Sequence, residues 1–160
     1  MEKNTHHAYV AEGCFWGVED VFRKVPGVLN VRVGYSGGHI ENPTYEEVCT
    51  GTTGHAEAVH IMYDPSIVSY ETILDTFWNS HDPTTPNRQG PDIGSQYRSV
   101  IFFVDEAQKN AAEKSRDMLG MSRKWNAPIV TEIVPFVHFY DAEEYHQRYF
   151  EKNGGSVCHI

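Results

Sequence analysis

The sequence has no long run of apolar residues and little positive charge. No segment approaches the roughly 18 apolar residues of a membrane-spanning helix, and residues 1–7 have no apolar signal region behind them. Thirteen Lys and Arg stand against 22 Asp and Glu, which gives a formal net charge of −9. This excess of negative charge opposes binding to nucleic-acid phosphates or anionic lipids. We therefore expect a soluble cytoplasmic protein that binds neither nucleic acid nor membranes.

Cysteine is also scarce. The three thiols, Cys14, Cys49 and Cys158, are widely spaced and odd in number, which argues against a secreted disulfide framework and permits a reducing compartment. A zinc-binding interaction module is an alternative reading of three cysteines and nine histidines. The chain lacks Cys-x-x-Cys and His-Glu-x-x-His, and in a strand His55 and His60 would point to opposite faces. The spacings therefore disfavour that module, and elemental analysis for zinc would test it.

The length and the apolar content suit one domain, residues 1–160, with a core that needs no disulfides. Apolar spacing predicts, in order, strand 8–12, a helix ending before Pro26, strand 28–35, a short helix near 46–48, strand 55–63, helix 70–78 capped by Ser69, strand 96–104, a helix from the Asp105 cap to Leu119 and strand 129–134. Residues 81–95 are predicted to be irregular, and such long loops are often functional. This order predicts an α+β fold, a two-layer ferredoxin-like α/β sandwich with a mixed sheet, helices on one face, long loops and an irregular C-terminal tail.

One thiol and two aromatic side chains lie between glycines in residues 13–17, Gly-Cys-Phe-Trp-Gly. Cys14 follows a predicted strand and precedes a predicted helix, where unpaired N–H groups and the helix dipole favour the reactive thiolate. The flanking glycines allow a ligand or another backbone to approach closely. The pattern favours a nucleophile beside an apolar pocket formed by Phe15 and Trp16. The alternative is a buried cysteine in a core turn, because cysteine is often fully buried.

A carboxyl group lies on the apolar face of the predicted strand 55–63. Side chains alternate along a strand, so Glu57 shares its face with Val59 and Ile61. Desolvation there raises the pKa of a carboxyl group and keeps it protonated near neutral pH, as a proton donor requires. The alternative is a glutamate at the end of a strand that reaches solvent or an arginine.

Four segments resemble the signature segments of the A-type peptide methionine sulfoxide reductases, and they occur in the order of that family. They are residues 13–17, 42–49, 54–59 and 92–99. The resemblance runs from about Tyr9 to the C-terminal tail, which is nearly the whole chain. It implies thioredoxin-dependent reduction of the S epimer of methionine sulfoxide, free or in proteins, and hence the repair of oxidised proteins. It implies no metal and no other cofactor.

The resemblance also implies roles for four residues in the chemical step. The thiolate of Cys14 attacks the sulfoxide sulfur while Glu57 protonates the sulfoxide oxygen. Tyr45 and Tyr97 hold that oxygen by hydrogen bonds. Methionine leaves, and Cys14 remains as a sulfenic acid. For the two tyrosines, half-buried packing is the simpler alternative.

Three further residues are implied in substrate binding. Phe15 and Trp16 would line an apolar cage for the S-methyl group of the substrate, which accounts for aromatic residues beside the nucleophile. Asp92 resembles a family residue that helps to place the substrate or its polar network. As a loop residue shortly before Gly94, Asp92 could equally be a turn residue.

The resemblance assigns the resolving step to a cysteine in the tail. Residues 151–160 form a polar, glycine-containing tail that we expect to be mobile enough to fold back over the active site. In the family a tail cysteine, here Cys158, converts the sulfenic acid to a disulfide that thioredoxin reduces. The chain lacks the second tail cysteine of some members, so a direct Cys14–Cys158 disulfide is the remaining route. Cys49 follows Val48 in a short helix and is expected to be a packed, inert thiol.

A different enzyme class would pair Cys14 with a histidine. A Cys-His hydrolase could use His55 or His81 as its base, provided that the imidazole lies within hydrogen-bond reach of the thiol. This reading leaves Cys158 without a role. An assay of acyl or peptide hydrolysis beside sulfoxide reduction would separate the two classes.

Overall fold

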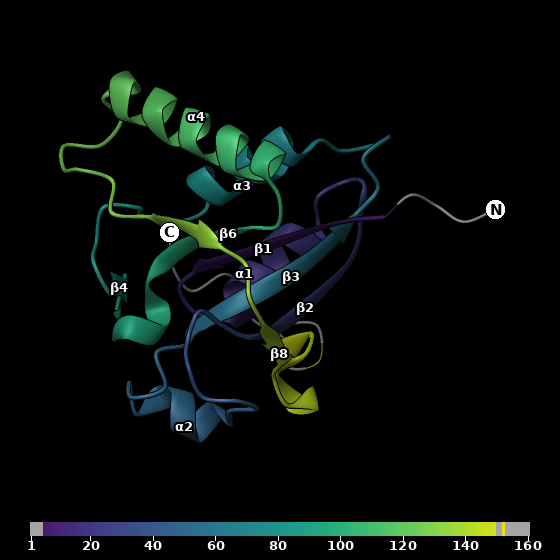
Figure 1. The fold of residues 1–160 in the computed structure, drawn as a ribbon, viewed down its shortest axis with the longest axis vertical. Coiled ribbons are helices and arrows are strands. Elements are labelled where there is room, and N and C mark those ends of the chain that lie inside the picture. The colour runs from purple at the N-terminus through teal and green to yellow at the C-terminus, as the bar shows by residue number, and fades with distance from the viewer. Residues whose placement is uncertain (1–4, 150–151, 153–160) are drawn as a thin grey trace.

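The computed structural model describes residues 5–149 and 152, and its centre is a twisted sheet of six strands (Figure 1). The strands are β1 (His6–Glu12), β2 (Val28–Ser36), β3 (Ala56–Tyr63), β6 (Ser99–Phe103), β7 (Glu132–Pro135) and β8 (Phe139–Asp141). Their order across the sheet is β7-β6-β1-β3-β2-β8. All neighbours are antiparallel except β6 and β7, which are parallel. The α+β class with a mixed sheet is therefore confirmed.

The longer helices pack on one face of this sheet. The helices are α1 (Phe15–Arg23), α2 (Tyr45–Cys49), α3 (Tyr70–Asn79) and α4 (Glu106–Ser122). Helices α3 and α4 lie side by side, and α2 lies apart from them near β8 (Figure 1). The predicted caps are confirmed, because Ser69 accepts a hydrogen bond from the Thr72 amide and Asp105 accepts one from the Gln108 amide. Within the described residues, no helix has the length and apolar character needed to cross a membrane.

The main core lies between the helices and the inner face of the sheet. Val10, Val59 and Ile61 project from the central strands and pack in one cluster with Phe22 of α1 and Phe77 of α3. All five side chains are fully buried. Any polar group on this inner face is therefore removed from water and depends on hydrogen bonds from the protein. This applies to Glu12 at the end of β1 and to Glu57 at the start of β3.

The predicted strand 96–104 is wrong in its first part. Ser95–Tyr97 forms a turn of 3-10 helix, and β6 begins only at Ser99. Gly94 precedes the turn with φ = 145°, a conformation that glycine readily adopts. The Arg98 amide then donates to the carbonyl of Ser95, which closes the turn. The turn places Tyr97 at the end of the sheet instead of within it.

The segment 81–95 is not wholly irregular, because it contains a small hairpin. Strands β4 (Arg88–Gln89) and β5 (Asp92–Ile93) pair antiparallel around Gly90, which has φ = 56°. The predicted strand 129–134 is also shifted, since β7 begins at Glu132. The Val130 amide donates to the carbonyl of Pro83 instead of pairing within the sheet. The contact of Val130 with Pro83 joins distant parts of the chain, so local patterns did not reveal it.

Candidate active site

The thiol of Cys14 lies at a tight turn between β1 and α1. Gly13 has φ = 110°, a backbone conformation that favours glycine. Cys14 is the residue that precedes the first turn of α1, and its carbonyl accepts a hydrogen bond from the Val18 amide. Its side chain is half-buried at the positive end of a nine-residue helix. The predicted strand-to-helix turn is confirmed, and its geometry favours a thiolate.

Glu57 lies buried beside this turn. Its side chain is 1% exposed, and Oε1 accepts a hydrogen bond from the Phe15 amide at 3.2 Å. Oε2 is buried and has no hydrogen-bond partner among the described residues. Burial raises the pKa of Glu57 to about 8; the hydrogen bond from Phe15 lowers it, and the charge of Asp92 raises it. Glu57 is therefore protonated at neutral pH and can give up a proton.

Two tyrosines lie within the electrostatic range of Glu57. Burial raises the pKa of Tyr45 and of Tyr97, and in each case Glu57 raises it further. Asp92 and Cys14 also raise the pKa of Tyr97. Both hydroxyls therefore remain protonated hydrogen-bond donors over the physiological range. The structure therefore brings together five polar residues from four separate segments of the chain. They are the predicted site residues Cys14, Tyr45, Glu57, Asp92 and Tyr97.

Tyr45 is held by a residue that the sequence did not indicate. Helix α2 begins with a capping box, in which the Thr44 hydroxyl accepts from the Glu47 amide and the Glu47 carboxylate accepts from the Thr44 amide. Glu143 accepts hydrogen bonds from the Tyr45 amide at 3.0 Å and from the Tyr35 hydroxyl at 2.9 Å. Glu143 thus anchors the first residue of α2 to the sheet, although it lies about 100 positions away in the chain.

The two aromatic residues beside Cys14 occupy different environments. Phe15 is buried, and its ring lies 6.2 Å from that of Tyr45 at an interplanar angle of 21°. Trp16 is half-buried, and its indole N–H donates to Nδ1 of His146 at 2.9 Å. The Trp16 ring also stacks on Tyr149, with ring centroids 3.8 Å apart. These contacts fix the orientation of the two rings that directly follow Cys14 in the chain, which we call the aromatic wall.

His146 is a second residue that sequence patterns missed. Its ring is fully buried and packs 4.4 Å from the ring of Tyr45. Burial lowers the pKa of His146, and the charge of Glu143 opposes this shift. Because Nδ1 accepts from Trp16, the neutral ring carries its proton on Nε2. Residues 141–149 show no clear helical or strand periodicity, so only the tertiary structure places His146 at the site.

Cys49 is not the packed thiol that the sequence predicted. It is exposed at the end of α2, where Val48 takes the buried position, and it interacts with Tyr45 and Gln96. Its expected packing is wrong because α2 has only five residues and buries a single side chain. Partial burial nevertheless raises the pKa of the Cys49 thiol, while the contacts with Tyr45 and Gln96 lower it. The raised pKa disfavours the thiolate at neutral pH.

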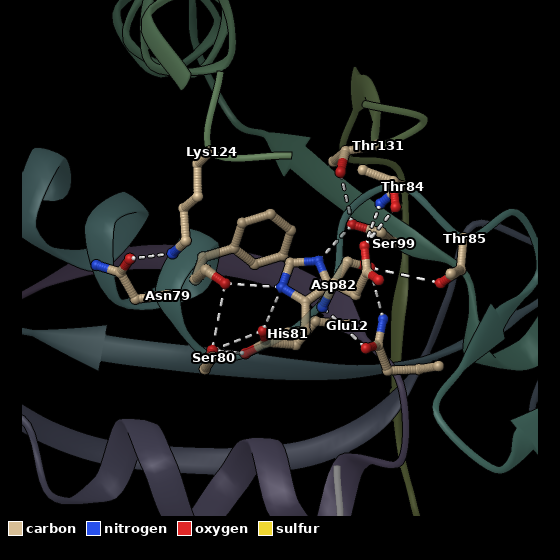
Figure 2. Close-up of polar contacts among 12 residues, drawn as sticks. Glu12, Asn79, Ser80, His81, Asp82, Thr84, Thr85, Ser99, Lys124 and Thr131 are labelled. Atoms are coloured by element: carbon tan, nitrogen blue, oxygen red, sulfur yellow. Dashed lines mark hydrogen bonds and ion pairs between the residues drawn. The ribbon is translucent and has the colours of Figure 1, made fainter. Parts of the chain in front are cut away.

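A buried polar network surrounds Glu12, at the end of β1 shortly before Cys14 (Figure 2). His81 Nδ1 lies 2.8 Å from Glu12 Oε2 and 2.7 Å from the carbonyl oxygen of Phe77. His81 Nε2 lies 2.7 Å from the hydroxyl of Ser99. The hydroxyl of Ser80 donates to the Glu12 carboxylate. Since two acceptors face Nδ1, that nitrogen carries a proton, and the network joins the ends of β1 and α3 to the start of β6.

These contacts remove the support for a Cys-His hydrolase. The ring nitrogens of His81 are engaged with Glu12, Phe77 and Ser99. Those of His55 are engaged with the Gly38 amide and the Ile40 carbonyl. Both histidines therefore stabilise the loops and strand ends around the site.

Replacing His81 by alanine is expected to lower the free energy of unfolding by roughly 3–5 kcal/mol, because the loss of a buried ring leaves a cavity and the fully buried carboxyl group of Glu12 loses a hydrogen-bond partner. The matched control is Asp117→Ala, which removes an exposed contact with Arg116 and is expected to change stability by less than about 1 kcal/mol. Urea denaturation of both variants provides the measurement. A change for His81→Ala no larger than that for the control would mean that the network does not stabilise the fold.

The comparisons with known proteins agree with this site. Residues 6–160 match the family model described as peptide methionine sulfoxide reductase. The chain belongs to the peptide methionine sulfoxide reductase family. It is therefore an enzyme of the oxidoreductase class. "Peptide methionine sulfoxide reductase MsrA" of Methanoculleus marisnigri is 59% identical over 157 residues, which cover 98% of this chain and 96% of that protein. The protein of the same name from Methanothermobacter thermautotrophicus is 60% identical over 148 residues, which cover 92% and 88%.

Solved structures show that this reductase shares its fold with a yeast protein. The reduced form of Mxr1 from Saccharomyces cerevisiae superposes with a TM-score of 0.90 at 38% identity, over 98% of this chain and 91% of that one. Mxr1 has also been solved in complex with Trx2, and that structure matches with a TM-score of 0.65 at 27% identity, over 93% and 89%.

Proposed function

We propose that this peptide methionine sulfoxide reductase reduces the S epimer of methionine sulfoxide, free or in proteins, to methionine, and so repairs oxidised proteins. The observation that carries this proposal is the buried, protonated Glu57, which accepts a hydrogen bond from the amide of Phe15, the residue after Cys14. Attack on a sulfoxide needs two groups, a nucleophile in its thiolate form and an acid that is still protonated. Neither group alone would suffice.

The chemical step follows from this pair. The Cys14 thiolate attacks the sulfoxide sulfur, and Glu57 transfers its proton to the sulfoxide oxygen. The new bond between the two sulfurs and the S–O bond of the substrate then break as the hydroxyl group passes to Cys14, which becomes a sulfenic acid, and methionine leaves with its sulfur reduced by two electrons. Tyr45 and Tyr97, as neutral donors, would hold the sulfoxide oxygen.

Substrate binding relies on the aromatic wall beside the thiol. Phe15 and Trp16 would enclose the S-methyl group, and the contacts of Trp16 with His146 and Tyr149 support a fixed orientation of that wall. Asp92, which lies within electrostatic range of Glu57 and Tyr97, would help to place the substrate. An apolar wall on one side and hydroxyl donors on the other distinguish the methyl group from the oxygen.

Regeneration needs a second thiol. Cys158, which lies outside the described residues, would attack the sulfenic sulfur and release water, leaving a Cys14–Cys158 disulfide. Thioredoxin would then reduce this disulfide with its own two thiols, and the solved complex of yeast Mxr1 with Trx2 supports that partner. Such a cycle requires a reducing compartment, which fits a cytoplasmic location. We place the whole cycle in one domain, residues 1–160, and the mobility predicted for residues 151–160 concerns a segment that, apart from Lys152, lies outside the described residues.

The scaffold of this site fits a ferredoxin-like arrangement. Strands β6-β1-β3-β2 are adjacent and antiparallel, with α1 connecting β1 to β2 and α3 lying between β3 and β6 in the chain. This βαββαβ order supports the ferredoxin-like sandwich that we propose, with β7 and β8 as additions at the edges.

Turnover of the separate sulfoxide epimers tests the proposal. With dithiothreitol as reductant, we expect methionine to form from the S epimer and none above background from the R epimer, because only one epimer can place its methyl group on the aromatic wall and its oxygen toward Glu57. Chromatography of the amino acids released at several times provides the measurement. Equal turnover of both epimers would contradict the assignment, and acyl or peptide hydrolysis in its place would indicate a different enzyme class.

A further inference from the structure

The proposed function leaves one buried carboxyl group of α1 without a role. Glu19 is 1% exposed and lies one turn after Trp16 on the same helix. Its Oε2 atom accepts a hydrogen bond from the backbone amide of Arg148 at 2.8 Å, across 129 positions of the chain. Burial raises the pKa of Glu19, whereas hydrogen bonds from the amides of Arg148 and Tyr149 lower it. One side chain of α1 therefore holds two successive amides of a distant segment.

The segment that Glu19 holds has a strained backbone. Arg148 has φ = 54°, in the left-handed region that residues other than glycine seldom adopt. Such a conformation persists only where the surrounding contacts fix it. Before Arg148, the side chain of Gln147 is bonded to both the amide and the carbonyl of Val33 in β2. The segment is thus held between β2 and α1, and Glu19 supplies the bond at the strained residue itself.

Tyr149, the residue after the strained one, covers one face of the Trp16 indole. The two rings are nearly parallel, with an interplanar angle of 10° and centroids 3.8 Å apart. The indole N–H is held by Nδ1 of His146 at 2.9 Å. A ring in stacking contact excludes other groups from the face that it covers. A substrate can therefore pack only on the opposite face of Trp16, and the position of Tyr149 decides which surface the aromatic wall offers.

We propose that Glu19 is a positioning residue for substrate binding. By holding the amides of Arg148 and Tyr149, it keeps the Tyr149 ring on Trp16 and so fixes the wall against which the S-methyl group packs. This inference rests on the proposed function and adds to it a carboxylate that does not touch the substrate. Without the anchor, the two rings regain rotamer freedom, and substrate binding would have to restrict them again.

Replacing Glu19 by glutamine tests this role. A carboxylate can accept from both amides, whereas the glutamine NH₂ group would face one backbone N–H, so the variant cannot hold both. Single turnovers of reduced enzyme are measured over a range of concentrations of free methionine S-sulfoxide. We expect the half-saturating concentration to rise about 3- to 10-fold, as for the loss of one ordered aromatic contact. The maximal rate should change by less than about twofold, because the reacting groups are intact.

Two further variants separate positioning from a general loss of structure. Asp20→Asn neutralises the neighbouring carboxylate of α1, which pairs with Arg23 and Lys24, and should leave both parameters unchanged. Tyr149→Leu removes the stacked ring and should raise the half-saturating concentration to a similar degree. If Glu19 acts through Tyr149, the double variant Glu19→Gln/Tyr149→Leu should bind no more weakly than Tyr149→Leu alone. Additive losses, an equal loss in Asp20→Asn, or no loss in Glu19→Gln would each overturn the proposal.

A measurement that needs no activity keeps this role separate from the proposed function. Near-ultraviolet circular dichroism reports the stacked rings, and Glu19→Gln should lose the same signal that Tyr149→Leu loses, while Asp20→Asn keeps it. Failure of the wild-type enzyme to reduce the S-sulfoxide would contradict the proposed function, whereas retention of the stacking signal in Glu19→Gln would overturn the role of Glu19 alone. A loss confined to steady-state turnover with thioredoxin would place Glu19 in regeneration and overturn its role in substrate binding.

Discussion

Replacing Glu57 by glutamine is expected to slow methionine formation in a single turnover by about 10²–10⁴-fold. The variant keeps the size of the side chain and can still form a hydrogen bond, but it has no proton to give to the sulfoxide oxygen. Substrate binding should change far less, because the aromatic wall is intact. Rapid-quench measurement of methionine released from reduced enzyme gives the rate, and its dependence on substrate concentration gives the binding.

The pH profile distinguishes this role from a structural one. Glu57 is protonated below its pKa of about 8 and ionised above it, so the wild-type rate should fall as the pH rises through about 8. The Cys14 thiolate needs the opposite change, so a bell-shaped profile is expected, with apparent values that belong to the coupled site. Glu57→Gln should lose the alkaline limb. If the variant keeps nearly the full rate and that limb, the proton comes from Tyr45 or Tyr97.

Unfolding of the same variant provides a control. A carboxyl group whose pKa is raised in the folded state is unfavourable to folding above its ordinary pKa of 4.5 and most unfavourable above about 8. Its neutral isostere removes this cost. Glu57→Gln should therefore be no less stable than wild type at pH 9 in urea denaturation. A slow but stable variant would locate the loss in the chemical step.

Replacing the thiols one at a time should separate attack from resolution. Cys14→Ser should release no methionine, because no nucleophile remains. Cys158→Ser should release one equivalent per enzyme and accumulate the sulfenic acid on Cys14, which mass spectrometry after trapping with dimedone detects. Turnover driven by thioredoxin should fail in both variants.

Cys49 provides the critical comparison for this experiment. It is exposed beside Tyr45, so it is placed to compete for the sulfenic acid, although its raised pKa disfavours attack at neutral pH. Sustained thioredoxin turnover by Cys158→Ser would contradict the role of the tail. Loss of that turnover in the Cys49→Ser/Cys158→Ser double variant would then assign resolution to Cys49, and its persistence would indicate direct reduction by thioredoxin.

Local signals in the sequence were sufficient to place the two groups to which we assign the chemistry. The turn at Gly13 and Cys14 was predictable because a strand pattern ends and a helix pattern begins within a few residues. The buried face of Glu57 followed from the period of two along a strand. The caps at Ser69 and Asp105 were predictable because each hydrogen bond spans only three residues.

The tertiary structure alone decided which groups support these residues. Trp16 donates to His146 across 130 positions of the chain, and Glu143 holds Tyr45 across 98. The contacts of His81 with Glu12 and of His7 with His60 likewise join distant segments. Such pairs leave no periodic trace in the sequence, because their partners meet only after the strands adopt their register in the sheet. The sequence by itself therefore determined the class of fold and the candidate nucleophile and acid, whereas tertiary packing decided how the aromatic wall, the buried network and the exposed thiol of Cys49 surround them.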